Sequence, residues 1–188
     1  MRRLTLYTRS RQVPASLAVL LVSALVLWTF TRDAEGDPRL PVLVLATGAM
    51  ATSAGLGGHD LALDRTAAIR WAPRRAAHVL IAAAAVCAAL PVVESLGGAP
   101  APLAFAVRDA AGLMGLAALG AALWGRQYAW TLPFTWLAFT LFAPPATGTP
   151  TRIATWLLLP PGTASATWTA VTLTALGTAT YALAGPRR

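Results

Sequence analysis

Lysine is absent from this chain of 188 residues, so all fifteen of its basic residues are arginine. A phosphate-binding loop, which needs a glycine-rich turn followed by a lysine that contacts the phosphates, therefore cannot be formed. We expect that the chain does not hydrolyse a nucleotide by itself. Arginine in place of lysine, together with abundant alanine and glycine, is typical of a bacterial genome rich in G and C.

Cysteine and histidine are also scarce. The single cysteine, Cys87, lies in an alanine-rich run and can form no disulfide within the chain. The two histidines, His59 and His78, are too few for a histidine-rich metal site, and no metal-binding or redox motif of paired cysteines or histidines occurs. We therefore predict no catalytic residue, no metal and no cofactor in this chain, and we do not expect it to be an enzyme.

Charged residues make up only 12% of the chain, whereas 56% is hydrophobic. The charges lie between six long apolar runs, and the runs show no period-two alternation. Most runs approach the length of about 17–25 residues that an α-helix needs to cross a membrane. The sequence predicts an all-α, multi-pass membrane protein with one transmembrane domain over 1–188. Its six spans are expected at about 14–31, 40–56, 76–96, 103–124, 128–143 and 165–185.

The arginines are distributed unevenly between the two sides that such a topology creates. If the amino terminus lies in the cytoplasm, eleven arginines fall in cytoplasmic segments and three fall on the opposite side. This distribution follows the positive-inside rule. It predicts a bacterial cytoplasmic membrane protein with both termini in the cytoplasm, and it argues for a lipid bilayer rather than a nucleic acid as the partner of the positive charge.

Three further segments are expected to be helical without crossing the membrane. Residues 1–12 are basic with interspersed apolar side chains, which favours a short interfacial helix. Between spans 2 and 3, Asp60 is a good N-cap and Pro73 a stop for a short cytoplasmic helix that ends near Trp71. Between spans 5 and 6, residues 144–163 have two proline-rich edges around the seven residues Ile153–Leu159, too few to span a bilayer, which predicts a re-entrant or interfacial hairpin.

Tryptophan and proline positions give two more expectations. Several tryptophans fall near predicted span ends, where they are expected to anchor at the membrane interface; they are Trp28, Trp124, Trp130, Trp156 and Trp168. Pro133 lies inside the fifth predicted span, three residues before Trp136. Because proline removes a backbone hydrogen bond, we expect a kink in that helix.

One charged pair, Arg108 and Asp109, lies within an apolar run. Ionisable residues at such a depth are rare and are candidate functional residues. Arg108 could extend towards the head groups, or pair with Glu94 at the end of span 3, or make a contact across a subunit interface. Adjacent helical residues point about 100° apart, so Arg108 and Asp109 cannot be assumed to satisfy each other. We predict that Glu94, Arg108 and Asp109 form an intramembrane polar contact.

Taken together, the chain resembles the membrane (permease) subunit of ABC-2 type transporters, in particular the compact actinobacterial ones. The architecture is similar over the whole chain. The local similarity lies in four stretches: Leu63-Asp64-Arg65-Thr66-Ala67-Ala68, Arg108-Asp109 with Gly112 and Gly115-Leu116, Gly125-Arg126 with Ala129-Trp130, and Gly185-Pro186-Arg187-Arg188.

The resemblance implies two partners: a separate cytoplasmic ATP-binding subunit, which holds ATP and Mg, and a second membrane subunit, either an identical copy or a sibling permease. It also implies that the ATPase docks on the loop between spans 2 and 3, at Asp60, Asp64, Arg65, Arg70 and Trp71. Because few polar residues lie in the spans, we expect export of an apolar or amphipathic substrate such as a lipid or hydrophobic peptide. The alternatives are a non-transporting membrane scaffold or immunity protein, and a membrane enzyme.

Overall fold

The computed structural model describes residue 37 and residues 39–57, 71–95, 100–144 and 147–187. Within these residues all regular structure is helical, and no strand occurs. The α-helices are α3 (Arg39–Ser53), α5 (Trp71–Glu94), α6 (Leu103–Trp124), α7 (Thr131–Phe142), α8 (Thr149–Ala154) and α9 (Ala164–Ala184). Short 3-10 turns are η1 (Ala54–Leu56), η2 (Arg126–Tyr128) and η3 (Trp156–Leu158).

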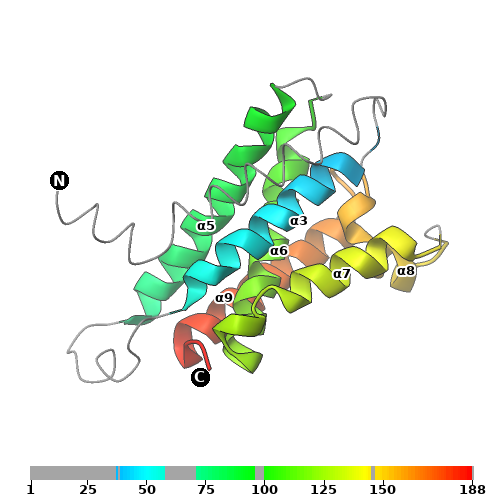
Figure 1. The fold of residues 1–188 in the computed structure, drawn as a ribbon. Helices are drawn as coiled ribbons and strands as arrows, with labels where there is room; N and C mark the ends of the chain where they lie inside the picture. The colour runs from blue at the N-terminus through cyan, green and yellow to red at the C-terminus, as the bar shows by residue number, and fades with distance from the viewer. Residues whose placement is uncertain (1–36, 38, 58–70, 96–99, 145–146, 188) are drawn as a thin grey trace.

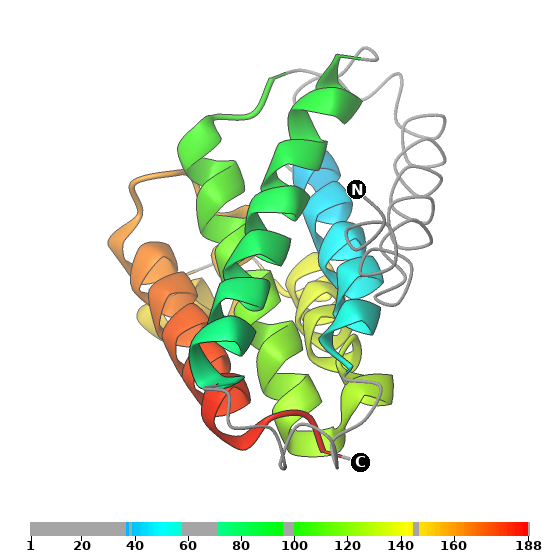
Figure 2. The same ribbon diagram turned by 90° about the vertical axis from the view of Figure 1, so that its left-hand side faces the viewer.

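Helix α6 is the centre of the bundle. It packs against α3, α5, α7 and α9, and its most extensive contact is with α9 (Figure 1). Figure 2 shows the long helices side by side along roughly one direction, with α5 rising from the end of the molecule near the C-terminus and α6 returning to it. Most of α6 is buried, whereas α5 buries one narrow stripe, Val79, Ala83, Val86 and Leu90. That spacing of three or four residues is the one expected of a helix that packs on one side only.

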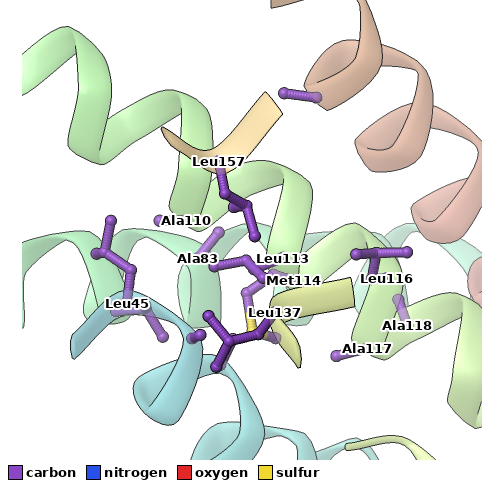
Figure 3. Close-up of a cluster of buried hydrophobic side chains, with 14 of the residues drawn as sticks. Leu45, Ala83, Ala110, Leu113, Met114, Leu116, Ala117, Ala118, Leu137 and Leu157 are labelled. Atoms are coloured by element: carbon purple, nitrogen blue, oxygen red, sulfur yellow. The ribbon is translucent and has the colours of Figure 1, made fainter. Parts of the chain in front are cut away.

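The apolar core lies around the middle of α6 (Figure 3). Leu113 and Met114 of α6 are fully buried between Leu45 of α3 and Leu157 of η3. Leu137 of α7 closes the same cluster. Trp156 and Leu157 of η3 are therefore core residues, although they belong to the connection between α7 and α9.

Three described helical segments are long and apolar enough to cross a membrane: Arg39–Leu56, Trp71–Glu94 and Leu103–Trp124. They coincide with the predicted spans 40–56, 76–96 and 103–124. The outer face of α5 exposes large apolar side chains, among them Leu80 and Ile81 at 53% and 67%. The predicted span 14–31, the interfacial helix over 1–12 and most of the cytoplasmic helix after Asp60 lie outside the described residues.

The last two predicted spans differ from the others. Helix α7 has 12 residues, or roughly 18 Å, which is shorter than a hydrocarbon core. Pro133 lies in its first turn, where an amide hydrogen has no helical partner, so the kink expected from this proline does not arise. Helix α9 has 21 residues without a charge, but six threonines lower its hydropathy.

Candidate functional site

The polar centre of the described structure is formed by Arg108 and Asp109 in α6. The helix begins after Pro102, whose carbonyl accepts from the amides of Phe105 and Ala106. It ends at Gly125, which has a φ of 95° and donates its amide to Ala121. Arg108 is therefore about 8 Å along the axis from the first helical residue. Arg108 is 8% exposed and Asp109 is fully buried.

The two side chains bind each other. Arg108 Nε donates to Asp109 Oδ1 at 2.7 Å. The guanidinium then reaches across to the segment before α9, where Nη2 donates to the carbonyl of Leu159 at 2.9 Å and Nη1 to the carbonyl of Pro160 at 3.1 Å. The Phe105 ring lies beneath it, with its centroid 5.1 Å from Arg108 Cζ. Arg108 thus joins α6 to Leu159 and Pro160, which lie 51 and 52 positions later in the chain.

Glu94, the third member of the predicted contact, has a different partner. Its Oε1 accepts the backbone amide of Ala101 at 2.8 Å and so connects the end of α5 to the approach to α6. Among the described residues, the ion pair of Arg108 is with Asp109 and not with Glu94. The neighbouring pair can form because the long arginine side chain folds back to the adjacent carboxylate while its two terminal nitrogens continue to the carbonyls.

The segment that Arg108 holds comprises residues 147–163, which we call the hairpin segment. It contains α8 and η3, and its Trp156 is fully buried. The Trp156 ring lies against Gly112, where a Cβ would overlap it. Trp156 is therefore a core residue and not the interfacial anchor that its position predicted, whereas Trp124, Trp130 and Trp168 are exposed.

A second set of hydrogen bonds fixes the other side of the hairpin segment. Trp136 Nε1 of α7 donates to the carbonyl of Ala154 at 2.9 Å, and the hydroxyl of Thr140 donates to the same carbonyl at 3.3 Å. That carbonyl belongs to the last residue of α8, and the last carbonyls of a helix have no amide donor within the helix. The hairpin segment is thus bound to α6 through Arg108 and to α7 through Trp136.

Two polar atoms at this centre are buried without a partner in the described part of the chain: Asp109 Oδ2 and Trp156 Nε1. Buried polar atoms are normally paired, because leaving one unpaired costs about 1–3 kcal/mol. The carboxylate can therefore accept a further hydrogen bond. Chemically, the arrangement can hold the hairpin segment against α6, and no group of three or more potential metal ligands occurs within the described residues.

The opposite end of the bundle is basic. Arg74 and Arg75 at the start of α5, Arg126 of η2 and Arg187 near the C-terminus all belong to this end (Figure 2). Here Arg187 donates its amide to Ala121, at the end of α6. The described acidic residues lie towards the other end of the bundle: Asp37 precedes α3, Glu94 is the last residue of α5, and Asp109 lies in the first half of α6. We call the four arginines Arg74, Arg75, Arg126 and Arg187 the basic end.

Of the predicted ATPase contacts, only Trp71 lies within the described residues; Asp60, Asp64, Arg65 and Arg70 lie outside them. Trp71 is the first residue of α5 and is partly buried, and its Nε1 has no partner there. Arg74 Cζ lies 5.8 Å from the centroid of its ring, within cation–π distance. Trp71 therefore lies beside Arg74 of the basic end.

Sequence reasoning found Arg108 and Asp109 but missed the groups that complete their site. The carbonyls of Leu159 and Pro160 and the ring of Trp156 come from a distant segment, and no local pattern brings them to α6. The one available signal was Gly112, a small residue one turn after Asp109. No protein-family model, curated protein or solved structure matches this chain.

Proposed function

We propose that this chain is the membrane subunit of an ABC-2 type exporter that moves an apolar or amphipathic substrate, such as a lipid or hydrophobic peptide. A separate cytoplasmic ATPase drives it, and a second membrane subunit completes the pore. The observation that carries the proposal is the buried Arg108–Asp109 pair. Ionisable residues inside membrane spans usually mark a functional pathway or a gate, because each costs about 2.5–3.5 kcal/mol to insert.

The proposed topology has six spans. The three apolar helical segments supply three, and α9 would be a fourth in spite of its threonines. Four of these hydroxyls, on Thr167, Thr169, Thr174 and Thr180, each donate to the carbonyl of the residue four positions earlier. They are thereby satisfied without water, as a membrane requires. Helix α7 together with the hairpin segment would take the place of the fifth span, and residues 14–31 would form the first span.

The basic end supports a cytoplasmic orientation and a docking role. Arg74, Arg75, Arg126 and Arg187 would face the cytoplasm under the positive-inside rule. Trp71 and the preceding loop with Asp60, Asp64, Arg65 and Arg70 would then meet the ATPase. The hairpin segment would lie at the outer side, where Arg108 fixes it against α6 and helps to close the pore.

A non-transporting scaffold or immunity protein is the second candidate. The observation in its favour is that the described core is apolar apart from a few residues, so it offers no continuous hydrophilic path. An apolar or amphipathic substrate needs no such path, and this is why we place the exporter first.

Purification of the affinity-tagged chain from its native host tests the proposal. An exporter subunit brings an ATPase with it, and the Asp64→Ala/Arg65→Ala double variant weakens that association without preventing insertion. Arg152→Ala, an exposed arginine in α8 at the other end of the molecule, is the matched control and leaves the association unchanged. Recovery of the intact chain from native membranes without any nucleotide-hydrolysing partner would favour the scaffold.

A further inference from the structure

A groove runs between the first half of α6 and the first half of α9. Its volume is about 740 Å³, which lies within the range of about 300–1,000 Å³ typical of small-molecule sites. The lining residues come from these two helices only; they are Leu103, Ala104, Val107, Arg108, Ala111, Thr167, Ala170, Val171, Thr174 and Ala175.

The position of the groove relates it to the membrane. It begins at Leu103, the first residue of a segment long and apolar enough to cross a bilayer, and continues to Ala111. This distance is about 12 Å along the helix axis. The groove therefore starts at the interface end of a candidate span and extends into its apolar part.

The chemistry of the walls is that of a hydrocarbon site with one polar group. Leu103, Val107 and Val171 are at least half exposed, so apolar surface is offered outward. The two threonine hydroxyls are already used, because Thr167 donates to Thr163 and Thr174 donates to Ala170. The wall thus presents methyl and methylene groups to an occupant.

Arg108 supplies the polar group. Its hydrogen bonds to Asp109, Leu159 and Pro160 use three of the five N–H donors of a guanidinium. Donors therefore remain for an ester or phosphate oxygen close to the interface. The guanidinium reaches the carbonyls of Leu159 and Pro160, which lie just before α9. An apolar groove that starts at the interface and carries this guanidinium matches an acyl chain joined to a polar head.

We propose that the groove between α6 and α9 binds an acyl chain of a membrane phospholipid. This inference depends on embedding in a bilayer and not on transport or on an ATPase. A second copy of the chain is the competing occupant, since small residues such as Ala111 and Ala170 also favour helix contact. The size of the groove and the donors of Arg108 favour the lipid.

Photo-crosslinking tests the proposal. The purified chain is reconstituted into phosphatidylcholine vesicles that contain a trace of phosphatidylcholine with a diazirine in its acyl chain, and crosslinked peptides are mapped by mass spectrometry. We expect crosslinks to concentrate on residues 103–111 and 167–175. Ala111→Trp places an indole in the space that an acyl chain would occupy, and it lowers crosslinking there roughly tenfold, which corresponds to about 1.4 kcal/mol of binding free energy.

The matched control is Ala88→Trp, which adds the same side chain to the exposed face of α5 and leaves the groove crosslinks unchanged. Ala175→Trp, at an exposed position on the groove's edge, repeats the block where folding is not at risk. Equal labelling of α5 and of the groove, or labelling that survives both groove variants, would overturn the proposal. So would efficient disulfide dimerisation of Ala175→Cys in a Cys87→Ser background, because a second copy would then fill the groove.

Discussion

Gly177 of α9 lies directly on the backbone of Gly115 in α6. A Cβ on Gly177 would overlap the Gly115 carbonyl, and a Cβ on Gly115 would overlap the backbone of Leu173. The two helices approach this closely only because neither residue has a side chain at the crossing. Small residues at a crossing allow close helix contact in membranes, where van der Waals packing replaces the hydrophobic effect. The crossing therefore sets how closely α6 and α9 pack.

We predict that Gly177→Ala lowers the stability of the folded protein. The added methyl group meets backbone, which cannot rotate away, so the expected loss is about 1–3 kcal/mol. Thermal unfolding in detergent measures it. Gly148→Ala is the control, because its Cβ would lie 3.7 Å from Pro150 Cδ, an ordinary contact. An equal loss in both variants would mean that alanine itself, and not the crossing, is responsible.

The Arg108–Asp109 pair predicts non-additive effects. Arg108→Ala leaves a fully buried carboxylate without its partner, which costs about 3–5 kcal/mol. Adding Asp109→Asn to that variant removes the lone charge and should restore part of the stability. Arg108→Ala and Glu94→Gln, by contrast, should be additive, since Glu94 binds the amide of Ala101.

A double-mutant cycle on unfolding in detergent separates these cases. The expected coupling is large for Arg108 with Asp109 and close to zero for Arg108 with Glu94. The reverse order would mean that Arg108 reaches Glu94 in the membrane. A neutral Arg108→Ala would show that the arginine side chain extends to the head groups instead.

Two tryptophans provide a further contrast. Trp156 is fully buried against Gly112, and Trp168 is 70% exposed. Truncating a buried tryptophan to alanine costs about 3–5 kcal/mol, so Trp156→Ala should unfold at a much lower temperature than Trp168→Ala. Trp156→Phe should retain most of the stability, because the indole N–H makes no hydrogen bond within the described residues. Equal midpoints for the two alanine variants would place Trp156 at the surface.

The sequence predicted the helices best where the ends of a run carry their own stop signals. The expected span 103–124 has the bounds of α6, because Pro102 precedes it and Gly125 follows it. Helix α5 starts at Trp71 rather than at residue 76, since its first turn is polar and arginines continue a helix without adding hydropathy. The six-span topology was predicted from hydropathy, and α7 shows the limit of that signal, because the run of 16 residues from 128 to 143 contains a helix of only 12 residues.

The candidate site was predictable only in part. A charged pair within an apolar run is visible from the sequence, and Arg108 and Asp109 were found in this way. Their partners are carbonyls of Leu159 and Pro160, and any residue could supply such groups, so nothing in the local sequence identifies them. Trp156 was expected at the interface because tryptophans at span ends usually lie there. Its ring instead packs against Gly112 of α6, a residue distant in the sequence that has no side chain.

The orientation of the bundle in the membrane is the claim on which the exporter, the docking role of the basic end and the outer hairpin segment all depend. It is tested most directly by single cysteines in a Cys87→Ser background, probed with a membrane-impermeant maleimide. Thr149 in α8 and Gln127 in η2 are both exposed. Figure 1 shows α8 at one end of the molecule and the segment that follows α6 at the other, near the C-terminus. Our account predicts that Thr149→Cys reacts in intact spheroplasts and that Gln127→Cys reacts only after permeabilisation. Labelling of Gln127→Cys from outside would contradict it.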